Sequence, residues 1–250
     1  MNVFWVETCC LIQCARFSLR HVRYFIVFLG IWGPSLLKWR ERRVVRVAFV
    51  TLQWIDDLLD GDRKSKREPL EVIDALLDGS SNDSLARLTR VLFTLLNATE
   101  RETFIALVRE MRRDCVRVLG REIWSAHEID DHLRRTFTLS IDLMLSVTRC
   151  RARANDVPSL IDALAWCSTF RDLDEDRRKG LDNIPRDVDI ETWTREHHAR
   201  AIADLTESKR QIDALDDPQS RKILMIFQRS IERFASRFAE AHHHAPLLVP

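Results

Sequence analysis

Four aspartates stand close together, directly after an apolar run that covers residues 44–55. They are Asp56, Asp57, Asp60 and Asp62. On an α-helix, Asp56 and Asp60 lie one turn apart on the same face, with Asp57 beside them. Carboxylates at the end of a helix meet the negative end of its dipole, and together they repel one another unless a cation neutralises them. The pattern therefore favours a cation site over a solvated helix end.

A second acidic cluster lies far downstream, in segment 170–176, which reads Phe-Arg-Asp-Leu-Asp-Glu-Asp. Asp172 and Asp176 again share a helix face. The competing interpretation is a surface helix on which Arg177 and Arg178 pair with these acids. Apolar residues that precede the cluster, such as Leu160, favour a segment that packs against a core instead.

Two such helices turned toward each other would offer a cation only oxygen ligands. Hard divalent cations prefer this ligand set, and Mg²⁺ binds through a few carboxylates together with substrate phosphates. The sequence therefore predicts a magnesium site, with Mn²⁺ as the alternative ion. The predicted metal ligands are Asp56, Asp57, Asp60, Asp172 and Asp176.

The elements that position these clusters are expected to be helices. The chain of 250 residues contains only 6 Gly and 7 Pro, its apolar residues recur at helical spacing, and no credible alternating strand runs occur. Helices are expected at 17–30, 39–60, 69–78, 83–97, 100–119, 127–153, 158–179, 190–215 and 219–242. The predicted fold class is all-α. The predicted organisation is an N-terminal extension (1–16), a single helical domain (17–242) and a flexible tail (243–250).

Composition bears on whether the protein binds nucleic acid or membranes and on the compartment in which it is expected. A net charge of +1 gives no electrostatic argument for nucleic-acid binding. Six cysteines without metal-site spacing indicate reduced thiols in a cytoplasmic protein. The longest apolar run, 24–37, is shorter than the roughly 20 residues of a membrane span, so only peripheral membrane contact is expected. The sequence leaves a monomer and a homodimer open.

The two acidic clusters resemble the two aspartate-rich motifs of the squalene/phytoene synthase family. Those enzymes carry an RDxxED segment followed by a glycine and by a hydrophobic residue next to proline. Here residues 171–176 are followed by Lys179-Gly180 and by Ile184-Pro185. The run from Arg42 to Asp60 is similar to the first motif of the family. The resemblance extends from about residue 18 to about residue 238 and is strongest at the two motifs.

The resemblance implies the class I isoprenoid synthase fold, an all-helical bundle with a central cavity. It implies a prenyltransferase in which Mg²⁺ neutralises a diphosphate, so that an allylic C–O bond can ionise. Apolar side chains would enclose the prenyl chain, although each of them is equally explained as core. The expected substrate contacts are Arg63, Arg171 and Lys179 at the diphosphate, and Phe49, Phe137 and Phe170 at the prenyl chain.

Three further positions depart from the family pattern. Gln53 stands where an arginine is usual, Ser168 where an asparagine is usual, and Asp142 near an expected glycine. The metal ligands are thus retained, while the pocket for a second prenyl group is altered. Asp142 either faces the cavity as a further substrate contact or pairs with Arg149 or Arg135 at the surface.

Three functions stay open. The first is condensation of two prenyl diphosphates, as in squalene and phytoene synthases. The second keeps the metal site but uses another small-molecule acceptor, such as an aromatic compound, or cyclises a single prenyl diphosphate. The third is a non-enzymatic binding or assembly protein, which two intact aspartate clusters disfavour. No Ser-His-Asp or Cys-His arrangement supports nucleophilic catalysis.

Overall fold

The structure is a computed structural model that describes residues 3–20, 33, 38–181, 183–185 and 188–243. These residues form α-helices and one 3₁₀ helix, and none of them lies in a β-strand. The helices are α1 Val3–Arg20, α3 Arg43–Leu59, α4 Pro69–Leu77, α5 Ser84–Leu95, α6 Ala98–Gly120, α7 Ala126–Val147, η2 Ala154–Asp156, α8 Pro158–Arg171, α9 Leu173–Lys179, α10 Ile190–Asp213 and α11 Pro218–His243. The predicted all-α fold class is confirmed.

The first helix begins earlier than expected. A helix was expected from residue 17, but α1 already starts at Val3. Its Val6, Cys10 and Cys14 recur every four residues and are all buried, so one side of the segment packs against protein. The rest of the expected helix, residues 21–30, lies outside the described residues.

Two long helices are shorter than expected. Segment 158–179 is divided at Asp172, whose backbone angles (φ −107°, ψ 7°) leave the helical range between α8 and α9. Aspartate has a low intrinsic helix propensity, which favours a break at this position. The helix expected over 127–153 ends at Val147, because Arg149 adopts a left-handed φ of 63°.

The chain divides into two compact units, which are described separately. Unit 1 comprises Met1–Glu122 and Asp142–Arg149, and unit 2 comprises Ile123–Ile141 and Cys150–Pro250. This is a finer division than the single helical domain expected over 17–242. Helix α7 begins in unit 2 and ends in unit 1.

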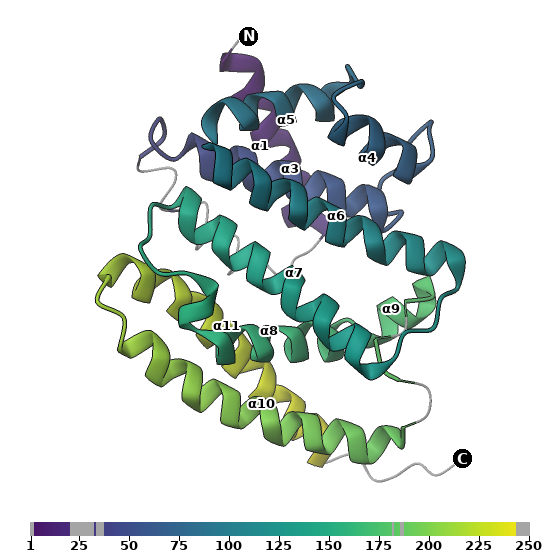
Figure 1. Ribbon diagram of the computed structural model, residues 1–250, viewed down its shortest axis with the longest axis vertical. Coiled ribbons are helices and arrows are strands. Elements are labelled where there is room, and N and C mark those ends of the chain that lie inside the picture. Colours follow the sequence, from purple (N-terminus) through teal and green to yellow (C-terminus); the bar gives the residue numbers. More distant parts are fainter. Residues whose placement is uncertain (1–2, 21–32, 34–37, 182, 186–187, 244–250) are drawn as a thin grey trace. The chain divides into compact units, whose positions relative to one another are not determined.

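Helix α3 is the centre of unit 1. It packs against α1, α4, α5 and α6 (Figure 1). Its Val47 and Ile55 are completely buried, as is Arg46. The guanidinium of Arg46 pairs with Glu7 of α1 at 3.1 Å, donates to the carbonyl oxygen of Trp39 at 2.6 Å and lies 3.7 Å from the ring centroid of Trp39.

A buried carboxylate joins the two parts of unit 1. Glu100, which is 2% exposed, forms a reciprocal capping box with Asn97 at the start of α6. It also accepts hydrogen bonds from Ser146 Oγ at 2.9 Å and from Arg149 at 3.2 Å. Both donors belong to segment Asp142–Arg149, so Glu100 holds that segment to the rest of the unit.

Unit 2 is built around α8, α10 and α11. Helix α10 packs on α8 and on α11, and the short connection 214–217 turns the chain back between α10 and α11 (Figure 1). The core residues Leu160, Ile212 and Leu224 are completely buried. This packing fixes the positions of side chains on the faces of α8 and α10.

Within the described residues, no helix is both long enough and apolar enough to cross a membrane. Most of the longest apolar run, 24–37, lies outside those residues.

Candidate functional site

The first aspartate cluster lies at the C-terminal end of α3, as expected. Asp56 and Asp57 are half-buried, and Asp60 is the exposed C-cap residue, whose N–H donates to the Asp56 carbonyl oxygen at 2.9 Å. Gly61 follows with φ of 75°, a left-handed conformation that ends the helix. The last turn of α3 contains no basic residue, so the helix dipole and the carboxylates add up to a region of negative charge.

One face of α3 brings three predicted residues onto one small cavity. Phe49, Gln53 and Asp57 recur every four residues and line it together with Gln13 and Phe17 of α1. The cavity has a volume of about 10 Å³, which is the size of a single water molecule. Helix α1 therefore covers the face on which substrate contacts were expected.

Arg63 is held beside the same face. Its guanidinium donates to Gln13 Oε1 at 2.9 Å and lies 3.7 Å from the ring centroid of Trp54. The sequence predicted Arg63 at this site but missed Trp54 and the residues of α1. The four-residue spacing of Cys10 and Cys14 was the available signal that this segment is helical and has one buried face.

The second cluster surrounds the break between α8 and α9. Arg171 donates to Asp172 Oδ2 from two nitrogens, at 3.0 and 2.6 Å. The Asp176 N–H donates to the Asp172 carbonyl oxygen at 2.8 Å, which keeps the two aspartates one turn apart. Asn183 donates to Asp176 Oδ2 at 3.4 Å. Both carboxylates are half-buried, and the side chain of Lys179 lies outside the described residues.

The two clusters belong to different units, so their facing each other stays a prediction. Among the described side chains, no three or more His, Cys, Asp or Glu residues are gathered so that they could hold a metal ion. A magnesium ion does not need such a group in advance, because it binds through one or two carboxylates and substrate phosphates. The described residues therefore do not gather the predicted ligands into one group, and whether these ligands bind magnesium stays a prediction.

Three remaining predicted residues lie on α7 and α8. Phe137 and Ser168 are half-buried in unit 2, and Asp142 is half-buried in unit 1. Arg149, one of the two expected partners of Asp142, pairs with Glu100 at 3.2 Å. None of the three lines a described cavity.

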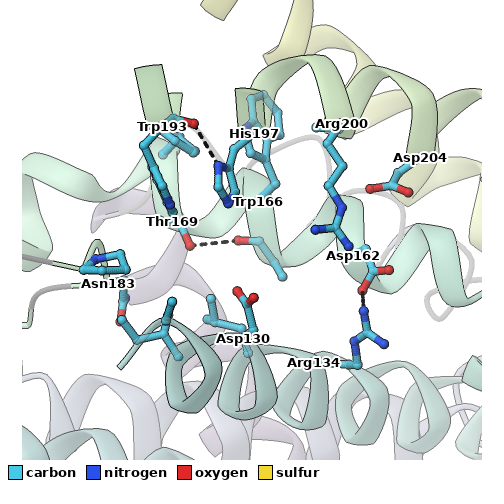
Figure 2. A pocket seen from close by; sticks show the side chains of 17 residues that line it. Asp130, Arg134, Asp162, Trp166, Thr169, Asn183, Trp193, His197, Arg200 and Asp204 are labelled. Carbon is cyan, nitrogen blue, oxygen red and sulfur yellow. Dashed lines mark hydrogen bonds and ion pairs between the residues drawn. The ribbon is translucent and has the colours of Figure 1, made fainter. Parts of the chain in front are cut away.

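A larger pocket that the sequence did not reveal lies entirely within unit 2 (Figure 2). Its volume is about 100 Å³, below the roughly 300 Å³ at which typical ligand sites begin. Phe170 alone among the predicted residues lines it. The other residues used below are Asp130 and Arg134 of α7, Asp162 and Trp166 of α8, Asn183, and Trp193, His197, Arg200 and Asp204 of α10.

One wall of the pocket could have been found from the helical spacing of its polar and aromatic residues. Trp193, His197, Arg200 and Asp204 follow one another at intervals of one turn along α10. They share a face, which packs over α8. The same periodicity also fits an ordinary amphipathic helix, so it indicates a polar and aromatic face without showing that a pocket lies beneath it.

Charges inside this pocket are unevenly compensated. Arg134 pairs with Asp162 at 2.7 Å (Figure 2). Burial raises the pKa of Asp204 above its ordinary value, and repulsion from Asp162 raises it further, while Arg200 and Arg134 act in the opposite direction. The carboxylate of Asp204 is thus a charge that its surroundings disfavour.

The resemblance to the squalene/phytoene synthase family rests on the sequence motifs alone. The described fold agrees with it only as far as the all-α class. No family model matches the chain, and no curated protein or solved structure matches it either.

Proposed function

We propose that the chain is a magnesium-dependent prenyltransferase, which binds a prenyl diphosphate and joins its prenyl group to a second small molecule. The observation that carries this proposal is the end of α3, where Asp56, Asp57 and Asp60 gather in a turn without a basic residue. The dipole of a helix adds negative charge at that end, so the turn favours a cation. In unit 2, Asp172 and Asp176 supply the same ligand type one turn apart.

The available ligands fit magnesium. All of them are carboxylate oxygens, and those of Asp56, Asp57, Asp172 and Asp176 are half-buried. When bound, magnesium would neutralise the diphosphate leaving group and so lower the barrier to breaking the allylic C–O bond. The residues that would hold it are Asp56, Asp57, Asp60, Asp172 and Asp176.

Basic side chains beside each motif would bind the diphosphate. Arg63 is oriented by Gln13 and by the ring of Trp54, which limits the conformations of its guanidinium near the end of α3. Arg171 is oriented by Asp172. Hydrogen bonds from guanidinium groups to phosphate oxygens are charge-assisted and therefore stronger than neutral ones. Lys179 is the third expected contact.

The acceptor is a second prenyl diphosphate or a different small molecule. The second alternative follows from the expected place of Asp142 in the family pattern, because a carboxylate at that position would repel a second diphosphate. Gln53 is neutral where the family carries an arginine, and Ser168 offers a hydroxyl where the family carries an amide. These residues would bind a neutral acceptor through hydrogen bonds.

The test is incubation of the purified chain with Mg²⁺ and single prenyl diphosphates of increasing chain length, with and without acceptors. Release of inorganic diphosphate and the organic product are measured. We expect release to depend on Mg²⁺ and to fall about 100-fold or more in Asp60→Asn.

Asp78→Asn is the matched control, because Asp78 is the C-cap residue of α4 just as Asp60 is of α3. It should keep wild-type turnover. Diphosphate release that persists in EDTA, or that falls equally in both variants, would overturn the proposal.

A further inference from the structure

The pocket of unit 2 combines carboxylates with aromatic rings. Asp130 and Arg134 come from α7, Asp162 from α8, and Arg200 and Asp204 from α10 (Figure 2). Three carboxylates therefore face two guanidinium groups, which leaves a net charge of −1 when His197 is neutral. A ligand that restores neutrality here carries one positive charge.

Only some of the charged side chains that line the pocket form ion pairs with one another. Asp162 and Arg134 form an ion pair at 2.7 Å. Neither Asp130 nor Asp204 has an ion pair of this kind with any described residue, and Arg200 only lowers the pKa of Asp204 from a longer distance. A bound cation would stabilise Asp204, whose ionised form is disfavoured by burial and by Asp162.

Aromatic rings form the other side of the pocket. Trp193 and His197 are stacked, with ring centroids 3.9 Å apart and an interplanar angle of 27°. Phe170 lies 5.3 Å from Trp193 and 5.6 Å from Trp166, centroid to centroid. The faces of such rings carry partial negative charge and attract organic cations, tryptophan most strongly.

Trp166 lines the pocket while most of its indole ring is buried against His198, Phe234 and Phe238. The residue is 7% exposed, and its Nε1 is buried without a hydrogen-bond acceptor among the described residues. A ligand in the pocket would therefore meet the indole ring of Trp166 and not its N–H.

We propose that this pocket binds a small organic cation that carries an alkylammonium group. The carboxylates of Asp130 and Asp204 and the ring of Trp193, which all line the pocket, would attract the ammonium group. A volume of about 100 Å³ limits the ligand to a small head group. The site does not depend on prenyl transfer, so it stands or falls by a binding measurement alone.

The test is isothermal titration calorimetry of the full chain with choline. The comparison compound is the neutral dimethylbutanol in which a carbon atom replaces the nitrogen of choline. We expect one choline per chain and binding at least tenfold tighter than that of the isostere, because only the charged compound gains from the carboxylates and ring faces.

Two variants test the assigned residues. Asp204→Asn should weaken choline binding at least tenfold, and Trp193→Leu should weaken choline more than the isostere. The control is Asp213→Asn, an exposed aspartate at the end of the same helix, which should bind as the wild type does. Equal binding of choline and its isostere, unchanged binding by Asp204→Asn, or no binding at millimolar choline would overturn the proposal.

Discussion

Asp204 and Asp74 show how differently the same side chain behaves in two settings. Asp74 is held by two hydrogen bonds from Arg112, at 2.7 and 2.9 Å, and these lower its pKa. Asp204 lacks such a partner among the described residues, and burial together with Asp162 raises its pKa. A stability effect that depends on pH is therefore expected at Asp204.

We expect Asp204→Asn to stabilise the protein near neutral pH. A raised pKa means that the folded state binds the proton more tightly than the unfolded chain does. The free-energy cost of ionising Asp204 is thus absent below the ordinary value of 3.8 and complete above the raised pKa. The groups that set it are Asp162, Arg200 and Arg134, with Asp130 and His197 in the same pocket.

The measurement is urea denaturation of the variant and wild type at about pH 7 and about pH 4. The stability difference should shrink at the lower pH. Asp216→Asn, in the exposed connection after α10, serves as the control. Equal stability of Asp204→Asn and wild type at both values would contradict the argument.

We expect Glu7→Gln to destabilise the protein by about 3 kcal/mol, because it leaves the completely buried Arg46 without its carboxylate. Glu7 also pairs with Arg43 at 2.8 Å. The control is Glu41→Gln, which breaks an exposed pair with Lys38 and should cost less than about 1 kcal/mol. Similar losses in both variants, measured by denaturant unfolding, would show that the buried pair contributes little.

The sequence could not reveal Arg46 as a buried charge. It stands within an apolar helical run, where a single arginine is normally explained as a solvent-facing residue. Its partner Glu7 lies far away in the chain, in a segment expected to be an extension. The pocket of unit 2 combines residues of three helices with Asn183 of a loop, so the spacing along α10 indicates only one of its walls.

At the scale of elements, the chain follows its local signals closely. Pro69, Pro158 and Pro218 were expected near helix starts, and each of them begins a helix. Gly61 and Gly180 were expected at helix ends, and both adopt left-handed angles there. Two helices that were expected to be continuous are interrupted, one at Asp172 and one after Val147. Neither position has a glycine or proline that would indicate the break.

Helix α1 offers a direct test of its packing on α3. Burial raises the pKa of Cys10 and of Cys14 to about 12. At about pH 8 only about one thiol in ten thousand is then ionised, so alkylation should be slow. The rate of iodoacetamide labelling, followed by mass spectrometry of the peptides, measures this.

Denaturant should restore ordinary labelling rates at both cysteines, because unfolding removes the burial that suppresses the thiolate. The unfolded chain is thus the control for the native one. Rapid labelling of Cys10 and Cys14 in the native protein would mean that α1 leaves α3 frequently in solution.

At the scale of the whole molecule, each unit has an apolar core that contains no predicted metal ligand. Val47, Ile55 and Leu88 are completely buried in unit 1, as are Leu160 and Ile212 in unit 2. The hydrophobic effect is the main source of folding free energy. Metal ions are therefore expected to serve activity and not folding.

If the proposed prenyl transfer depends on magnesium, EDTA should abolish it while the far-ultraviolet circular dichroism and the melting temperature stay close to those of the untreated chain. Readdition of Mg²⁺ should restore turnover. Loss of helical signal in EDTA would indicate instead that a metal ion is needed for the fold.

The interrupted order of unit 1 has a consequence for how the protein is made. Glu100 accepts hydrogen bonds from the hydroxyl of Ser146 and from the guanidinium of Arg149. These two residues are synthesised 46 and 49 residues after Glu100. At about 5–20 residues per second, a ribosome needs about 2 to 10 seconds to reach them. During that interval Oε2 of Glu100 can already accept from the Asn97 N–H, whereas the native donors to its Oε1 do not yet exist. Unit 1 therefore completes its native hydrogen bonds only after the first segment of unit 2 has already been translated.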